Sequence, residues 1–269
     1  DLPLAVDILA DIVQHSVFDP EELAREQGVV MQEIFQSIDT PDDIVFDHFQ
    51  ATAYGDQPLG RPVLGTVDSV GRLSSEVIGG FQRAHYSPDR LVIGAAGRVD
   101  HDVLVDLVQA HFTDLNGHAP PLPQPARYTG GAYHESREVE QAHIVLGFDG
   151  VSYSDPDYYA SVILATLLGG GMSSRLFQEV REKRGLAYTV NAFASSYIDG
   201  GLFTLYAGTA PDEVTQLMPV LRGEIDKVRV AGGVEQGERR AVQVSATHGD
   251  GRTEGYTFDL ETGLLLMIS

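Results

Sequence analysis

The stretch that decides the fold reads LLGGGMSSRLFQEVREKRGLAYTV, from Leu167 to Val190. The glycines at 169–171 interrupt an apolar helical pattern. A second helix is predicted over Ser173–Lys183, and it should end at Gly185 because glycine readily adopts the left-handed conformation that closes helices. A strand is predicted from Leu186 to Ser195. The stretch therefore indicates mixed α and β structure with a glycine-rich joint or a point of close backbone packing.

Two side chains of this stretch, Arg181 and Tyr188, could carry chemistry. The turn at Gly185 should bring them together, and such a pair can bind a peptide carbonyl and stabilise a developing oxyanion. Arg181 would also suit a basic helix end with Lys183 and Arg184, which complements the helix dipole. On the residues alone the second interpretation is favoured. The glycines match no nucleotide-binding pattern, since neither GxGxxG nor Gly-Lys-Ser/Thr is present.

A second candidate lies in REQGVVMQE, which ends at Glu33. Glu26 and Glu33 are seven residues apart on a helix predicted to start at Asp19-Pro20, so their carboxylates share one face. Apolar residues fall on the same face: Leu23, Val29 and Val30. Carboxylates on an apolar stripe are costly unless they are paired or metal-bound, but solvated glutamates at a partly exposed helix edge fit the pattern as well.

The remaining pattern alternates helices, strands and loops. Helices are predicted over 1–16, from Asp19 to about Tyr54 with a break near Asp39–Pro41, and over 74–85, 102–112, 155–168 and 212–228. Strands are predicted over 91–96, 139–148 and 202–207, the last forming a hairpin around Asp199-Gly200-Gly201. The glycines and prolines of 55–65 predict a loop.

An internal repeat suggests two related domains. LVIGAAGRVDHDVLVDLVQAHF, from Leu91, resembles LFTLYAGTAPDEVTQLMPVLRGEI, from Leu202, and each reads as a strand followed by an amphipathic helix. Four prolines in residues 116–129 mark an interdomain linker. Tandem duplication explains both features. We therefore predict an α+β fold, with residues 1–117 in a first domain, a linker over 118–130 and residues 131–269 in a second domain.

The composition limits the classes of partner. A formal net charge of −21 opposes nucleic-acid or anionic membrane partners, which need clustered basic residues. It suits solubility, or alternatively a chamber that attracts basic peptides. The absence of cysteine excludes disulfides, thiolate nucleophiles and cysteine zinc sites. It fits a reducing compartment, so we favour the cytoplasm, with the mitochondrial matrix and periplasm left open. No apolar stretch is long enough for a membrane helix.

The nine histidines do not form a metal motif by themselves. No two of them are four residues apart, so neither HExxH nor HxxEH is present. A GxSxG serine motif is also absent. The residues alone therefore contain no complete catalytic constellation.

Three segments nevertheless resemble one family of zinc peptidases. AREQGVVMQEI (24–34) and DTPDDIVFDHFQATAYGDQPLGRPVLGT (39–66) resemble the first domain of the catalytic subunit of mitochondrial processing peptidase and its bacterial homologues. LLGGGMSSRLFQEVREKRGLAYTV resembles the second domain of the same insulinase (pitrilysin-like) family. The resemblance covers about residues 1–228. It implies two tandem homologous domains, each an antiparallel-rich sheet packed with helices, both incomplete here.

The resemblance also implies an inverzincin site and its residues. In that family an HxxEH helix supplies two zinc-binding histidines and a catalytic glutamate, and a later helix supplies a third, glutamate ligand. By motif position that ligand is Glu33, and Glu26 supports it from beside the site. Arg181 and Tyr188 match family residues that contact the substrate near the scissile bond. Only 32 residues precede Glu33, so HxxEH is expected upstream of Asp1, and the chain is expected to be a fragment.

The implied function is zinc-dependent endopeptidase activity in the parent protein. Zinc lowers the pKa of its bound water, and the resulting hydroxide attacks a peptide carbonyl. The expected substrate is a peptide, basic if the acidic charge steers it, bound as an added edge strand. The expected assembly is a homodimer or two-component heterodimer. The fragment itself should show little zinc-dependent proteolysis.

Two other functions stay open. A non-catalytic family homologue could act as a structural or partner subunit, although a scaffold has no physical need of Glu33, Arg181 and Tyr188 together. A small-molecule binding module built on the glycine run is the weaker alternative. After Val228 the sequence departs from the family, with glycines and polar residues where a long helix is expected, and GLLLMIS (263–269) resembles a family helix that resumes after an insertion.

Overall fold

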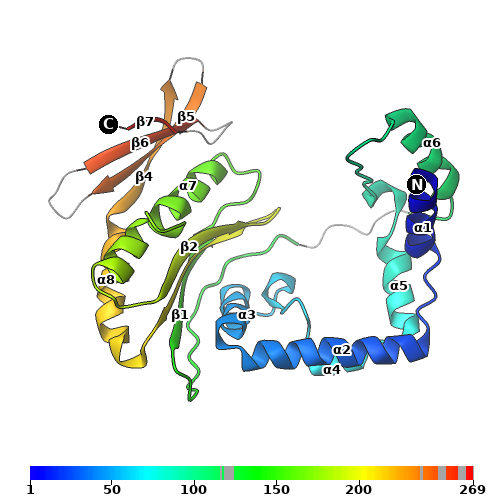
Figure 1. Ribbon diagram of the computed structural model, residues 1–269, viewed down its shortest axis with the longest axis horizontal. Helices are drawn as coiled ribbons and strands as arrows, with labels where there is room; N and C mark the ends of the chain where they lie inside the picture. The colour runs from blue at the N-terminus through cyan, green and yellow to red at the C-terminus, as the bar shows by residue number, and fades with distance from the viewer. Residues whose placement is uncertain (116, 118–123, 237–238, 248–252, 260–264, 269) are drawn as a thin grey trace. The chain divides into compact units, whose positions relative to one another are not determined.

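A computed structural model describes residues 1–115, 117, 124–236, 239–247, 253–259 and 265–268 of the chain (Figure 1). These residues form helices and antiparallel strands, which confirms the predicted mixture of α and β structure. The contacts divide the chain into two compact units. Unit 1 comprises residues 1–36 and 64–124, and unit 2 comprises residues 37–63 and 125–269. The domain boundaries read from the sequence stay a prediction.

The regular secondary structure of unit 1, in the part that the structure describes, is all helical. Its helices are α1 (Leu2–Gln14), most of α2 (Pro20–Asp39), α4 (Val67–Gly71), α5 (Ser75–His85) and α6 (His101–His111). Their starts coincide with capping residues. The Asp19 carboxylate accepts hydrogen bonds from the N–H groups of Glu21 and Glu22 at 2.9 and 3.2 Å, as the sequence predicts. Ser74 and Asp100 cap α5 and α6 in the same way. Each such cap stabilises a helix by about 1 kcal/mol.

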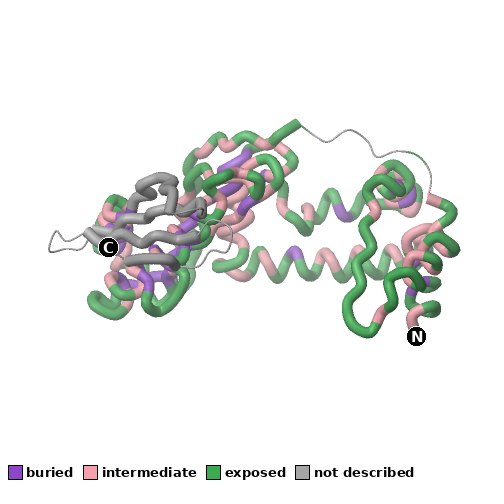
Figure 2. Tube along the Cα trace, turned by 90° about the horizontal axis from the view of Figure 1, so that it is seen from above, coloured by how far each residue is buried: buried purple, intermediate pink, exposed green. Residues whose placement is uncertain are grey.

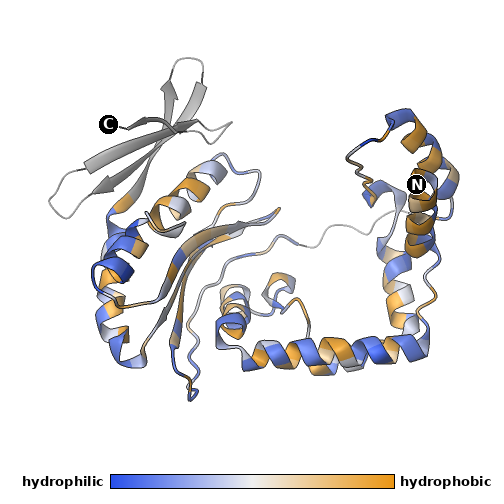
Figure 3. Ribbon diagram, viewed as in Figure 1, coloured by the Kyte–Doolittle hydropathy of each residue, from blue (hydrophilic) through white to orange (hydrophobic). Residues whose placement is uncertain are grey.

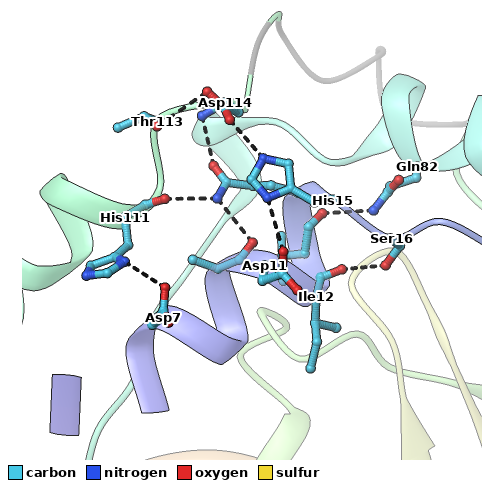
Figure 4. Close-up of polar contacts among 12 residues, drawn as sticks. Asp7, Asp11, Ile12, His15, Ser16, Gln82, His111, Thr113 and Asp114 are labelled. Carbon is cyan, nitrogen blue, oxygen red and sulfur yellow. Dashed lines mark hydrogen bonds and ion pairs between the residues drawn. The ribbon is translucent and has the colours of Figure 1, made fainter. Parts of the chain in front are cut away.

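Polar contacts join the carboxyl ends of α1 and α6 (Figure 4). The Gln14 amide donates to the His111 carbonyl oxygen at 2.9 Å and accepts from the Asp114 N–H at 2.8 Å. His15 Nε2 lies 2.8 Å from Asp114 Oδ2, and His111 Nδ1 lies 3.3 Å from Asp7 Oδ1. Two histidines at helix ends therefore join α1 to the end of α6 through carboxylates.

The strand predicted over Leu91–Ala96 is wrong. The described residues of this segment are irregular, and none of the described residues of unit 1 forms a strand with which it could pair. Val92 is 92% exposed. A β-branched segment needs a neighbouring strand to satisfy its backbone, so propensity alone does not make a strand. Of the two repeat copies, only the one from Leu202 contains both strand and helix.

Unit 2 is built on a three-stranded antiparallel sheet, here called sheet A. Its strands are β1 (Ala142–Gly150), β2 (Thr189–Ser196) and β3 (Gly201–Thr209), in the order β1-β3-β2. β2 and β3 form the predicted hairpin, with Ser196 opposite Gly201. Side chains alternate between faces, so Leu205 of β3 faces one side of the sheet and Leu202 faces the other.

The main core of unit 2 lies between sheet A and the helices α7 (Tyr158–Gly169) and α8 (Val214–Asp226). α7 is apolar around most of its surface (Figure 3), and the buried positions of unit 2 gather along it and sheet A (Figure 2). Leu176, Leu205, Leu217 and Leu221 are at most 1% exposed. Burial of a leucine side chain contributes about 1.5–3 kcal/mol, so this cluster contributes strongly to the stability of unit 2.

Helix α3 (Pro41–Tyr54) covers the opposite face of sheet A. The predicted helix break is confirmed, since α2 ends at Asp39 and α3 begins at Pro41. Phe49 of α3 packs against Gly147 of β1, where any side chain would overlap its ring. The buried Tyr54 hydroxyl donates to the Gly201 carbonyl oxygen at 3.2 Å. A glycine in the strand therefore permits the close approach of the helix.

The segment from residue 125 to 141 is tied to α3 and to the last turn of α2. The N–H of Thr129 donates to the Ala53 carbonyl oxygen at 2.8 Å. Arg137 donates to the Ile38 carbonyl oxygen at 2.6 Å, and Glu135 lies 3.2 Å from His48. Residues 118–123 of the predicted linker lie outside the described residues.

The last part of unit 2 is a second antiparallel sheet. Its strands are β4 (Val228–Gln236), β5 (Arg239–Thr247), β6 (Thr253–Asp259) and β7 (Leu265–Ile268), in that order. The helix inferred for 263–269 is therefore wrong over Leu265–Ile268; residues 263, 264 and 269 lie outside the described residues. A four-residue apolar run cannot be assigned to helix or strand by periodicity alone. Among the described residues, no helix is long and apolar enough to cross a membrane.

Candidate active site

Glu26 and Glu33 project from one side of α2 in unit 1. Seven residues at 100° each leave them about 20° apart around the helix. The neighbouring face packs inward: the Gln27 amide donates to the carbonyl oxygens of Val70 and Leu73 at 2.8 and 2.9 Å, and Ile34 is buried. Both glutamates are exposed, and neither has a hydrogen bond or ion pair with any residue that the structure describes. Their carboxylates are therefore available to a ligand.

Arg181 lies in a helical segment with an unusual last turn. The segment begins at Arg175, and the π-helix η3 spans Phe177–Glu182. Gly185, at φ +66°, ends it as predicted. The Leu186 N–H then donates to the Val180 carbonyl oxygen at 3.0 Å, which turns the chain toward β2. π-turns are rare and often mark functional sites.

This turn brings Arg181 and Tyr188 together. The guanidinium carbon of Arg181 lies 4.6 Å from the centroid of the Tyr188 ring and 4.8 Å from that of Phe177. Tyr188 is 73% exposed, and the Arg181 side chain is 36% exposed. Such cation–π contacts contribute about 0.5–1 kcal/mol at exposed sites. The two groups thus share one accessible surface, where a carbonyl oxygen could reach the guanidinium N–H groups.

The neighbouring basic residues are engaged elsewhere. Lys183 and Arg184 both bind the Glu179 carboxylate, and Arg184 also donates to the Glu179 carbonyl oxygen at 2.7 Å. Hydrogen bonds, the strongest from Lys183 and the next from Arg184, lower the pKa of Glu179 to about 2. Among the residues that the structure describes, Arg181 has a single ion pair, a long one with Glu182 at 4.0 Å. Of these three cations, Arg181 is the one whose guanidinium lies over aromatic rings rather than on the Glu179 carboxylate.

The glycine run supports close packing. A Cβ at Gly169 would overlap the backbone of Ala192 in β2, so glycine lets the end of α7 approach the sheet. At Gly171 a Cβ would meet open space. The glycine run therefore joins α7 to the segment that carries Arg181. Its sequence does not match a phosphate-binding motif.

One feature that the sequence did not reveal is a buried ion pair. Glu224 of α8 binds Arg175, at the start of the segment that carries Arg181. The two residues are 49 positions apart. Arg175 lies within the stretch 167–190, but Glu224 lies outside every candidate catalytic or metal-binding motif found in the sequence. The sequence offered a single hint of this ion pair, namely an acidic residue, Glu224, within the helical pattern predicted over 212–228.

The described residues do not by themselves form a zinc site. No three histidine, aspartate or glutamate side chains among them are grouped so that they could hold a metal ion. Catalytic zinc usually takes three protein ligands. The exposed Glu33 carboxylate has the right chemistry for one of them. It belongs to unit 1, whereas Arg181 and Tyr188 belong to unit 2.

Comparison with known proteins identifies the family. The family described as "Insulinase (Peptidase family M16)" matches residues 1–67, and "Peptidase M16 inactive domain" matches residues 72–243. An uncharacterized zinc protease of Streptomyces coelicolor is 43% identical over 90% of this chain and 55% of its own length. The uncharacterized zinc protease YmxG of Bacillus subtilis is 39% identical over 81% of this chain and 53% of its own length.

A solved structure shares the fold. The peptidase M16 inactive domain from Pseudomonas fluorescens superposes with a TM-score of 0.76 at 22% identity, covering 82% of this chain and 56% of that one. This chain spans about half the length of the curated relatives it matches. The two family matches together cover almost all of its residues. The chain therefore belongs to the insulinase family of M16 peptidases.

Proposed function

We propose that this chain is part of a zinc-dependent metalloendopeptidase that cleaves peptides or unfolded protein segments. The observation that carries the proposal is the stacked pair of Arg181 and Tyr188 on an accessible surface of a family member. Relatives at 39–43% identity are named zinc proteases, which supports a peptidase over an unrelated binding module.

In this proposal Arg181 and Tyr188 hold the substrate. A guanidinium presents several N–H donors in one plane. The Arg181 side chain is partly exposed over the ring, so such donors could bind a carbonyl oxygen. The same donors would stabilise negative charge that develops on that oxygen during hydrolysis. The Tyr188 hydroxyl, on an exposed ring, is the neighbouring donor.

Glu33 is proposed as one zinc ligand, with Glu26 supporting it. Both carboxylates are exposed and bind no other described residue, so the oxygens of Glu33 are free to coordinate a metal. The described part of this chain offers no complete ligand set. The remaining ligands are proposed to come from an HxxEH helix of the longer protein. With Glu33 as its one proposed ligand, the chain of residues 1–269 should hold little zinc and show little proteolysis.

The proposed substrate is an extended, basic peptide. The net charge of −21 favours basic partners by long-range steering. A homodimer or two-component heterodimer is proposed as the assembly. A non-catalytic subunit is the competing function, and the match of residues 72–243 to a domain described as inactive keeps it in view.

Hydrolysis of fluorogenic peptides by the longer protein tests the proposal. We expect cleavage of a basic peptide, loss of cleavage with a zinc chelator and recovery on adding zinc. An acidic peptide of equal length is the matched control and should be cleaved more slowly, with the difference shrinking at high salt. Absence of cleavage, or cleavage that survives the chelator, would favour the non-catalytic subunit or another chemistry.

A further inference from the structure

Glu224 is a buried carboxylate that the proposed mechanism does not use. It lies in α8 and is 2% exposed. Both Nε and a terminal nitrogen of Arg175 reach its Oε2 atom, at 3.0 and 2.9 Å. Lys227 reaches the other oxygen, Oε1, at 2.7 Å. Both oxygens of the carboxylate are therefore neutralised by cations.

A buried carboxylate bound by two cations constrains the positions of those side chains more than it stabilises the fold. A buried ion pair gains little over apolar packing, but removal of one partner leaves an uncompensated charge. Two N–H groups of one planar guanidinium directed at a single oxygen fix the direction of the Arg175 side chain. Arg175 is 17% exposed, so this contact is largely shielded from water.

Arg175 begins the helical segment that carries Arg181. On that segment Leu176 and Val180 are fully buried in the same core as Leu217 of α8. Apolar contacts of this kind hold the segment against α8 without directional preference. The hydrogen bonds of Arg175 to Glu224 are directional, and they join the start of the segment to α8.

We propose that Glu224 is a positioning residue: through Arg175 it sets the rotation of residues 175–182 against α8 and so keeps Arg181 over the Tyr188 ring. The importance of this for catalysis rests on the proposed function. The geometric claim does not, because it concerns the placement of one side chain over another.

The test is nuclear magnetic resonance of the chain with labelled arginine. Ring currents of Phe177 and Tyr188 should move the δ-methylene protons of Arg181 upfield, and Arg181→Lys assigns the signal. Glu224→Gln should abolish the upfield displacement. The control Asp226→Asn changes an exposed acid of the same helix, 71% exposed, and should leave it intact. Lys227→Gln should also leave it intact, since Arg175 keeps its partner.

The Arg137 signal reports whether unit 2 stays folded, because its side chain is held by Glu135 and lies outside the core around Glu224. Loss of the Arg181 displacement with an unchanged Arg137 signal supports the proposal. An unchanged Arg181 signal in Glu224→Gln overturns it. If the Arg181 and Arg137 signals both lose their native shifts in Glu224→Gln, the Arg175→Lys variant is measured instead. Lysine keeps the positive charge but cannot place two N–H groups on Glu224. Loss of the upfield Arg181 displacement in Arg175→Lys, with an unchanged Arg137 signal, supports the proposal. Any other result in that variant overturns it.

An activity arm separates this inference from the proposed function. In the longer protein, Glu224→Gln should lower kcat for a basic peptide more than it raises KM, and Asp226→Asn should do neither. If the wild-type protein cleaves nothing, the proposed function fails while the resonance experiment still decides the role of Glu224.

Discussion

The guanidinium of Arg181 lies over the ring of Tyr188, with the guanidinium carbon 4.6 Å from the ring centroid. The contact depends on the π-turn at 177–182 and on the reversal at Gly185, which together return the chain to β2. It joins a charged donor to an exposed aromatic surface, and the proposed substrate contact follows from it.

Replacing Arg181 by lysine should impair catalysis in the longer protein. Lysine keeps the charge but cannot present a planar set of donors above the ring. Loss of one such donor typically lowers kcat by roughly 100-fold. Steady-state kinetics on a basic peptide measure the effect. Arg184→Lys is the control, because Arg184 binds Glu179, and its activity should stay near wild type. Equal losses in the two variants would contradict a special role for Arg181.

Tyr188→Phe separates the hydroxyl from the ring. Phenylalanine keeps the surface on which Arg181 stacks, so only a hydrogen bond to substrate is lost, which corresponds to about tenfold in kcat/KM. Tyr188→Ala removes the ring as well and should be more damaging. Tyr153→Phe, at another exposed tyrosine, provides the control. A Phe variant with wild-type kinetics would leave Tyr188 with a packing role alone.

The contact between His15 and Asp114 should make unit 1 sensitive to pH. The hydrogen bond with Asp114 raises the pKa of His15 from 6.5, and the same bond lowers the pKa of Asp114 from 3.8. The stabilisation is therefore fully present between about pH 4 and 6.5. It is lost as pH rises through the folded pKa of His15, and as pH falls through that of Asp114.

Hydrogen-exchange protection of the α1 amides measures this effect across pH. The neighbouring Asp11, 3.3 Å from His15, acts in the same direction. His15→Gln should flatten the pH dependence, whereas His101→Gln, at the exposed start of α6, should not. Protection that is independent of pH in the wild-type chain would contradict the assignment.

Gly147→Ala should loosen α3 from sheet A. The added methyl group would overlap the Phe49 ring, and overpacking of this kind costs about 1–3 kcal/mol. Urea unfolding followed by tyrosine fluorescence measures the loss, since the chain has no tryptophan. Gly80→Ala is the control: it lies in α5 with open space around it, and it should gain up to about 1 kcal/mol. An unchanged free energy of unfolding in Gly147→Ala would show that the contact is not tight.

Local sequence signals predicted most helices and the hairpin of unit 2. The capping carboxylate of Asp19, the break at Pro41 and the stop at Gly185 each have a local cause, and each lies where the sequence indicates. The meeting of Arg181 and Tyr188 follows from the same turn. Glu26 and Glu33 share a face because α2 is continuous between them.

The failures concern structure that depends on distant partners. The segment at Leu91 has strand propensity, but no described strand of unit 1 pairs with it. The apolar run at Leu265 pairs with β6, which its own periodicity could not show. The contact between Glu224 and Arg175 joins residues far apart in the chain. In each case a tertiary neighbour, absent from the local pattern, determined the outcome.

The zinc content of the longer protein, with and without the Glu33 carboxylate, is the most direct test of the central proposal. We predict about one zinc per chain in the wild-type protein, bound through three protein ligands. Glu33→Gln should lose that zinc at a buffered metal concentration at which the wild type retains it. Glu26→Gln should weaken affinity by about 10- to 100-fold, as loss of a supporting residue does. A Glu33→Gln protein that holds zinc as tightly as the wild type would contradict the account.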